Sequence, residues 1–226
     1  MVKKYIIWDF DGTLANTNEI IVASWQATLR HYLGHELPVR DIEATFGETL
    51  VYTIPNFIPG ADVDEVIDFY RDFQDSHHDV YNVRLFDGVR ELLEELRSRG
   101  CLIGIGTSRT LYSLQNYLSE LGVEHLVDEI VSMNDVTNHK PHPETANAVL
   151  LKLMGRDGEE IEIPDSVKNE AIFIGDTKFD IGCANAAGID SVLVGWSHYI
   201  DIDALEAEGY VPKYRIETPS ELLELI

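Results

Sequence analysis

The chain has 226 residues and a formal net charge of −23, from 17 basic and 40 acidic side chains. Such an acidic surface repels phosphate backbones and anionic lipid headgroups. We therefore expect neither a nucleic acid nor a membrane as a partner. No apolar run is long enough to span a bilayer or to form a signal peptide. Two cysteines at no metal or redox spacing are typical of free thiols, and we expect a cytoplasmic protein.

Five short apolar runs predict buried parallel strands, because they are too continuous for half-exposed ones. They span residues 5–10, 101–107, 129–133, 171–176 and 191–195. Helical patterns separate most of them, and this alternation predicts an α/β fold with a doubly wound, Rossmann-like parallel sheet. The acidic, turn-rich stretch 155–170 predicts a solvated surface loop.

One region breaks this alternation. Residues 15–84 contain amphipathic helical patterns but no clear strand. We therefore expect an α-helical cap domain at 15–84, inserted into a catalytic core formed by residues 1–14 and 85–226. The length of the chain suits such a core with a smaller module.

Two acids follow the first strand, in the sequence YIIWDFDGTLA. Asp9 and Asp11 are two apart on an extended chain, so both side chains point to the same side and Phe10 points to the other. Carboxylates this close repel each other unless a cation lies between them. Gly12 and Thr13 permit a tight turn that returns the backbone to the acids, which favours a site over solvated acids at a strand end.

Polar residues also follow the later strands. They are Thr107 with the amide groups of Ser108 and Arg109, then Lys140, and then Asp176 with Asp180. Ligands of open α/β sheets bind beyond the carboxyl ends of the strands, where all of these residues are expected. Carboxylates, a lysine, a hydroxyl and helix-opening amides suit Mg²⁺ and a phosphate group.

These motifs, in this order, resemble those of the haloacid dehalogenase superfamily. DFDGTL, Thr107, Lys140 in KPHPE, and GDTKFD match its four motifs, and the whole chain is similar to the phosphoglycolate phosphatase and β-phosphoglucomutase branch with a helical cap. The resemblance implies that Asp9 is the nucleophile, forming an aspartyl phosphate, and that Asp11 is the general acid and base.

The resemblance also assigns the ligands. Mg²⁺ would be held by Asp9, the backbone carbonyl of Asp11, and Asp176, with Asp180 in support. The phosphoryl oxygens would be bound by the residues at the turn and the later strand ends, namely Gly12, Thr107, Ser108 and Lys140. Positioned donors of this kind stabilise the charge that spreads over those oxygens in the transition state.

We therefore predict a Mg²⁺-dependent phosphatase of a small phosphorylated metabolite such as phosphoglycolate, and a monomer by the family's default. Two alternatives stay open: a sugar-phosphate mutase, and a catalytically idle binding protein on the same scaffold. The loop 46–49, with Glu48 and Thr49, and Arg109 are candidates for substrate specificity. A mutase engages a second phosphate, and without a cap lysine Arg30, Arg40 or Arg71 would have to do so.

Overall fold

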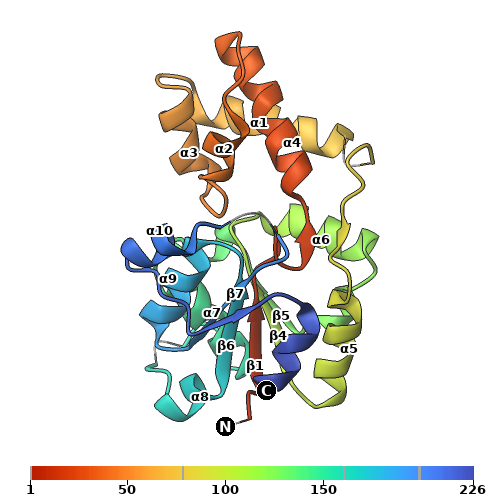
Figure 1. The fold of residues 1–226 in the computed structure, drawn as a ribbon, viewed down its shortest axis with the longest axis vertical. Helices are drawn as coiled ribbons and strands as arrows, with labels where there is room; N and C mark the ends of the chain where they lie inside the picture. The colour runs from red at the N-terminus through yellow and green to blue at the C-terminus, as the bar shows by residue number, and fades with distance from the viewer. Residues whose placement is uncertain (1, 78, 160, 198–199) are drawn as a thin grey trace.

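The structure, a computed structural model, describes residues 2–77, 79–159, 161–197 and 200–226. Within those residues, six parallel strands form the central sheet in the order β5-β4-β1-β6-β7-β8 (Figure 1). Their bounds are β1 Tyr5–Trp8, β4 Leu102–Gly106, β5 Glu129–Val131, β6 Ala171–Gly175, β7 Asp190–Val194 and β8 Tyr214–Ile216. The predicted α/β fold with a parallel sheet is confirmed.

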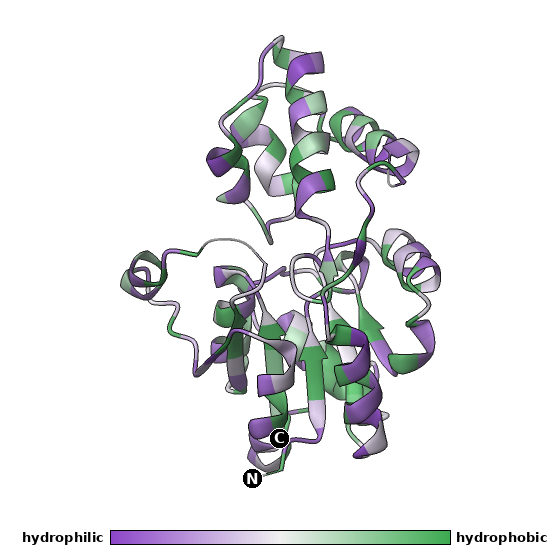
Figure 2. Ribbon diagram, turned by 45° about the vertical axis from the view of Figure 1, so that its right-hand side comes forward, coloured by the Kyte–Doolittle hydropathy of each residue, from purple (hydrophilic) through white to green (hydrophobic). Residues whose placement is uncertain are grey.

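Helices cover both faces of the sheet. They are α5 Val89–Ser98, α6 Leu111–Glu120, α7 Glu144–Leu153, α8 Asp165–Asn169, α9 Lys178–Ala187 and α10 Ile202–Ala207, with short 3₁₀ turns η1 Glu124–Leu126, η2 Met133–Asp135 and η3 Pro219–Glu224. One apolar core joins the sheet to α5, α6 and η3, and the other joins it to α7 and α9. Figure 2 shows the hydrophobic residues concentrated along the strands, as a sheet buried on both faces requires.

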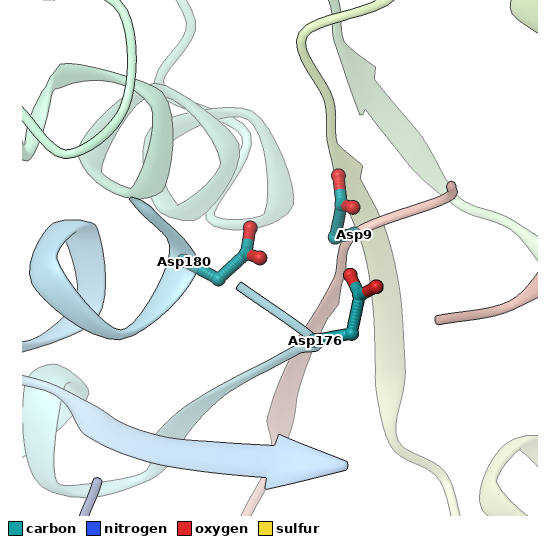
Figure 3. Close-up of side chains that lie close together, drawn as sticks. All are labelled: Asp9, Asp176 and Asp180. Carbon is teal, nitrogen blue, oxygen red and sulfur yellow. The ribbon is translucent and has the colours of Figure 1, made fainter. Parts of the chain in front are cut away.

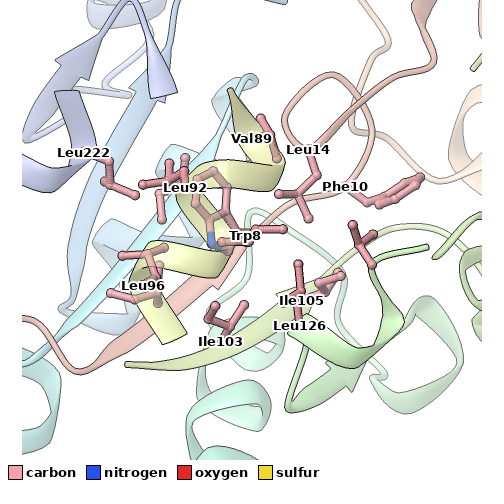
Figure 4. Close-up of a cluster of buried hydrophobic side chains, with 14 of the residues drawn as sticks. Trp8, Phe10, Leu14, Val89, Leu92, Leu96, Ile103, Ile105, Leu126 and Leu222 are labelled. Atoms are coloured by element: carbon pink, nitrogen blue, oxygen red, sulfur yellow. The ribbon is translucent and has the colours of Figure 1, made fainter. Parts of the chain in front are cut away.

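Alternation along β1 divides its side chains between the two cores. Ile6 and Trp8 lie in the core beneath α5, which Figure 4 shows around Trp8, and Ile7 lies in the core beneath α7 and α9. Phe10 continues the first set and is fully buried. The side chain of Asp9 therefore leaves the strand on the face opposite Phe10, as the spacing of two predicts.

A separate group of helices follows β1. It consists of α1 Asn18–Leu33, α2 Val39–Glu43, α3 Leu50–Phe57 and α4 Val63–His77, and it lies above the carboxyl edge of the sheet in Figure 1. This α1–α4 group has its own apolar core around Trp25, Ile54 and Tyr70. Short antiparallel strands, β2 Ala15–Asn16 and β3 Arg84–Leu85, join it to the sheet. These two strands were not predicted from the sequence, because two residues are too few to show a period.

Two expectations about the rest of the chain were wrong or incomplete. The stretch 155–170 is not simply a solvated loop, because α8 forms within it and Ile163 is buried against the core beneath α7 and α9. The edge strand β8 was not predicted, since three residues carry little periodicity. No helix in the described ranges is both long and apolar enough to cross a membrane.

Candidate active site

Three strands end side by side at the centre of the sheet. Trp8 of β1 lies opposite Ile105 of β4 and Ile174 of β6 in the parallel register. The chain leaves these strands at Asp9, Thr107 and Asp176, so the sheet itself brings these residues to one edge. The Asp9 amide still donates to the Ile174 carbonyl, at 2.8 Å, which fixes the start of the loop that follows.

Three buried carboxyl groups gather at this edge. Asp9, Asp176 and Asp180 each have an oxygen within 4.8 Å of the other two, and Figure 3 shows them coming from β1, from the end of β6 and from α9. Asp180 is fixed by the start of α9, where its Oδ2 accepts hydrogen bonds from the Thr177 amide and hydroxyl at 3.0 and 2.7 Å. This capping arrangement turns the carboxyl group back towards the strand ends.

Lys140 is the buried cation beside these acids. Its Nζ donates to Asp9 Oδ1 at 2.8 Å, to Asp180 Oδ1 at 2.7 Å and to the Gly106 carbonyl at 3.2 Å. Burial lowers the pKa of Lys140, but the negative charges of Asp180 and Asp9 outweigh it, so the pKa lies above its usual value. The lysine is therefore charged, and it neutralises only part of the acidic cluster.

The excess of negative charge in this cluster affects the pKa of Asp9. Burial raises its pKa well above the usual value, Lys140 opposes that rise, and Asp180, Asp176 and Asp11 add to it. A second cation at this place would lower the pKa of Asp9 again, because an opposite charge within a few ångströms favours the charged form.

The donor set fits Mg²⁺. Mg²⁺ prefers oxygen ligands and is bound in proteins by one or two carboxylates. Both oxygens of Asp180 accept hydrogen bonds within the protein, whereas Asp9 Oδ2 accepts none from the residues that the structure describes. Asp9 thus has one oxygen open to a metal or a substrate, and Asp180 is suited to orient Lys140.

Asp176 is held by Thr13, which the sequence analysis named only for its turn, and by Ser197, which it did not name. Its Oδ1 accepts from the Thr13 hydroxyl at 3.1 Å and its Oδ2 from the Ser197 hydroxyl at 2.8 Å. Gly12 faces the same carboxyl group at φ +71°, and a Cβ there would lie 2.0 Å from Asp176 Oδ2. Ser197 follows β7 at the same sheet edge, so the strand-end rule that found Asp176 could have found it as well.

Gly12 therefore differs from the expected phosphate ligand. Its amide donates to the Ala15 carbonyl at 2.9 Å and closes the turn, so that N–H is not free for an anion in this structure. The glycine is required by the left-handed backbone and by the close approach of Asp176.

Asp11 lies in the same pocket but has a different partner. Arg109 donates to both of its oxygens, with Nε–Oδ2 at 2.9 Å and Nη2–Oδ1 at 2.7 Å, and the Thr17 hydroxyl donates to Oδ1 at 2.7 Å. The Arg109 guanidinium stacks over Tyr117, 4.7 Å from the ring centre. Arg109 was a candidate for substrate specificity, and in the structure its guanidinium instead holds the carboxyl group of Asp11.

Thr107 is buried at the end of β4. The Arg109 amide donates to its hydroxyl at 3.1 Å, so only the Ser108 amide of the expected pair has no hydrogen bond in the described part of the chain. The Ser108 hydroxyl donates to the Gly47 carbonyl at 2.9 Å, a direct contact between the sheet edge and the α1–α4 group.

A pocket lies between the α1–α4 group and the sheet edge. Its floor includes Asp9, Asp11 and Asp176, and its other walls include Trp25, Phe46, Glu48, Tyr70 and Arg71. Of the two specificity candidates in the loop 46–49, Glu48 lines the pocket. Thr49 does not line it, because it is buried at the start of α3.

The fold and these strand-end acids define the class of the protein: the chain belongs to the haloacid dehalogenase-like hydrolase family, whose model matches residues 6–194. Within that family it is a phosphatase. It is 34% identical to pyrophosphatase PpaX of Bacillus pumilus and 31% identical to that of Bacillus mycoides, over 98% of this chain and 95% of each relative. It is also similar to a solved haloacid dehalogenase-like hydrolase from Streptococcus pneumoniae, with 25% identity, a TM-score of 0.78, and 99% and 98% of the two chains covered.

Proposed function

We propose that the protein is a Mg²⁺-dependent phosphatase that cleaves a small phosphorylated metabolite through an aspartyl phosphate on Asp9. The observation that carries this proposal is the buried cluster of Asp9, Asp176 and Asp180 around Lys140. Lys140 holds one oxygen of Asp9, and the other oxygen accepts no hydrogen bond from the described residues, so it is the one suited to attack phosphorus.

Asp9 and Asp176 would hold the metal, as would the backbone carbonyl of Asp11. When bound, Mg²⁺ neutralises the carboxylates and the phosphoryl oxygens during the displacement. The Thr107 hydroxyl and the Ser108 amide would bind the phosphoryl oxygens from the end of the neighbouring strand β4.

Asp11 would transfer the proton. Arg109 and Thr17 hold Asp11 in the floor of the pocket, where it would give a proton to the leaving oxygen and then take one from the attacking water. The fixed position matters because general acid–base catalysis needs the carboxyl group within hydrogen-bond reach of the reacting oxygen.

The α1–α4 group would act as the cap. We assign it residues 15–84 and the catalytic core residues 1–14 and 85–226. The contact between Ser108 and the Gly47 carbonyl supports a lid that lies directly over the site and excludes water and large substrates. The curated relatives are named pyrophosphatases, so we add pyrophosphate to phosphoglycolate as a candidate substrate.

The test is a screen of phosphorylated metabolites with purified protein and Mg²⁺. We expect release of free phosphate from small monophosphates or from pyrophosphate, and loss of activity with EDTA. Asp9→Asn should be inactive while folded. Full activity of that variant, or conversion of β-glucose 1-phosphate to glucose 6-phosphate far faster than phosphate release, would contradict the proposal.

A further inference from the structure

The pocket is lined by several acidic side chains, which bear on the charge of the substrate it can bind. Asp9, Asp11, Glu48 and Asp176 all line it, in a chain with a net charge of −23. A substrate with negative charge beyond its transferable phosphoryl group would be repelled unless a cation of the pocket were available to it.

Two of the nearby cationic side chains already form ion pairs with aspartates of the protein. Lys140 is bonded to Asp9 and Asp180 below the pocket. Arg109 uses Nε and Nη2 on Asp11, and its Nη1 donates to the Ser113 hydroxyl at 2.8 Å. Each of its guanidinium nitrogens therefore already has a protein acceptor.

Arg71 of α4 differs from both. It lines the same pocket and is half-buried, yet it makes no ion pair or hydrogen bond with the residues that the structure describes. The carboxylates of α4 are exposed, namely Asp64, Glu65, Asp68, Asp72 and Asp75. The helix thus turns its acids to solvent and its arginine towards the pocket.

Arg71 lies next to Tyr70 on α4, and both residues line the same pocket as Asp11. Tyr70 and Gln74 are buried, also line the pocket, and are joined by a hydrogen bond from Gln74 Nε2 to the Tyr70 hydroxyl at 3.3 Å. Burial raises the pKa of Tyr70, the charge of Arg109 opposes that rise, and the charge of Asp11 adds to it. Since Asp11 would protonate the leaving oxygen, the leaving group would lie in the pocket that Arg71 also lines.

We propose that Arg71 binds a second anionic group, a phosphate or a carboxylate, on the leaving part of the substrate. This inference rests on the proposed phosphatase function and names its substrate class: phosphate esters or anhydrides whose leaving group is itself an anion. Arginine suits the role because its planar guanidinium can donate two parallel hydrogen bonds to either kind of anion.

The other candidate arginines of the cap do not fit this role. Arg30 pairs with Glu36, and both side chains are largely exposed. The Arg40 side chain is 85% exposed and lies beside Asp41. Neither lines the pocket, so of the three arginines considered from the sequence the structure favours Arg71.

The test compares substrates that differ in the charge of the leaving group. The leaving group of pyrophosphate is phosphate, and that of 2-phosphoglycolate is an alcohol that carries a carboxylate. The leaving group of 2-hydroxyethyl phosphate is a neutral alcohol of similar size. Wild type should prefer the two anionic substrates. Arg71→Gln should lower kcat/KM for at least one of them about 10–100-fold more than for 2-hydroxyethyl phosphate, since a charged hydrogen bond has that strength. Arg71→Lys should restore part of the loss, and Arg40→Gln is the matched control, with kinetics like wild type.

The outcomes separate the inference from the proposed function. A selective loss with pyrophosphate alone assigns the subsite to phosphate, and a selective loss with 2-phosphoglycolate alone assigns it to carboxylate. Equal losses on all three substrates in a folded Arg71→Gln, or a wild-type preference for the neutral ester, would overturn the inference and leave the phosphatase intact. A wild-type protein that hydrolyses no phosphate compound in the presence of Mg²⁺ would overturn both.

Discussion

Replacing Gly12 by alanine should displace the Asp176 side chain and so weaken the proposed Mg²⁺ site. The residue sits at φ +71°, and the new Cβ would lie 2.0 Å from Asp176 Oδ2 and 2.7 Å from Ser197 Oγ. The left-handed backbone alone costs about 1–2 kcal/mol for a residue other than glycine. Because a 2.0 Å contact cannot persist, the Asp176 side chain must also move, and it would leave the proposed Mg²⁺ site.

Gly34 supplies the control. It has φ +75° and nothing within 4 Å of its would-be Cβ, so Gly34→Ala carries the backbone cost without the contact. Unfolding should be followed with and without Mg²⁺. Mg²⁺ at about 100 times its Kd stabilises the native state by about 2.7 kcal/mol, and each tenfold rise in Kd removes about 1.4 kcal/mol of that.

We expect Gly34→Ala to keep the full stabilisation by Mg²⁺ and Gly12→Ala to lose half of it or more. Gly12→Ala should also be the less stable of the two variants without the metal. If both variants lost the same stability and kept the same response to Mg²⁺, the reasoning from the contact between Gly12 and Asp176 would be refuted.

Three further predictions concern single side chains. Asp11→Asn should fold and bind Mg²⁺ yet turn over about 10²–10⁴-fold more slowly, and unchanged turnover with an unchanged pH–rate profile would remove Asp11 from proton transfer. Lys140→Met leaves buried carboxylates without their cation, so urea unfolding without metal should show a loss of about 3–5 kcal/mol, and a loss below about 1 kcal/mol would contradict the charge balance proposed here. Burial raises the pKa of Asp190, but hydrogen bonds from Lys213 and Lys3 outweigh it and keep that pKa below its usual value. A carboxyl group whose pKa is lowered by folding stabilises the native state above the pKa it has in the unfolded chain, and this stabilisation is lost on acidification. Asp190→Asn should therefore lower the free energy of unfolding by about 1 kcal/mol at pH 7 and by progressively less below about pH 4. A loss that stayed constant with pH would contradict this prediction.

The sheet and its polar edge were predictable because local patterns encode them. Each buried strand is a continuous apolar run, and Asp9, Thr107 and Asp176 follow their strands directly. A parallel sheet then brings the strand ends together whatever the sequence distance between them. The helix ends were likewise marked locally, as by Gly34 at the end of α1.

The contacts between elements were not predictable in this way. Arg109 and Asp11 are 98 residues apart, and no period or spacing relates them. The helical pattern of α4 indicates which residues share a face, but not that Arg71 faces the sheet edge, since the placement of the α1–α4 group depends on packing. Ser197 is the exception, because it follows β7 at the same sheet edge and the strand-end rule could have found it.

The most direct test of the account is to identify the residue that carries the phosphoryl group. Wild-type protein with Mg²⁺ and a substrate that it turns over would be quenched within a single turnover and treated with borohydride, which reduces an acyl phosphate to an alcohol. Mass spectrometry of the peptide around Asp9 should then show homoserine at position 9, and none should form in Asp9→Asn. Turnover without any modified Asp9, or homoserine at position 11 instead, would contradict an aspartyl phosphate on Asp9.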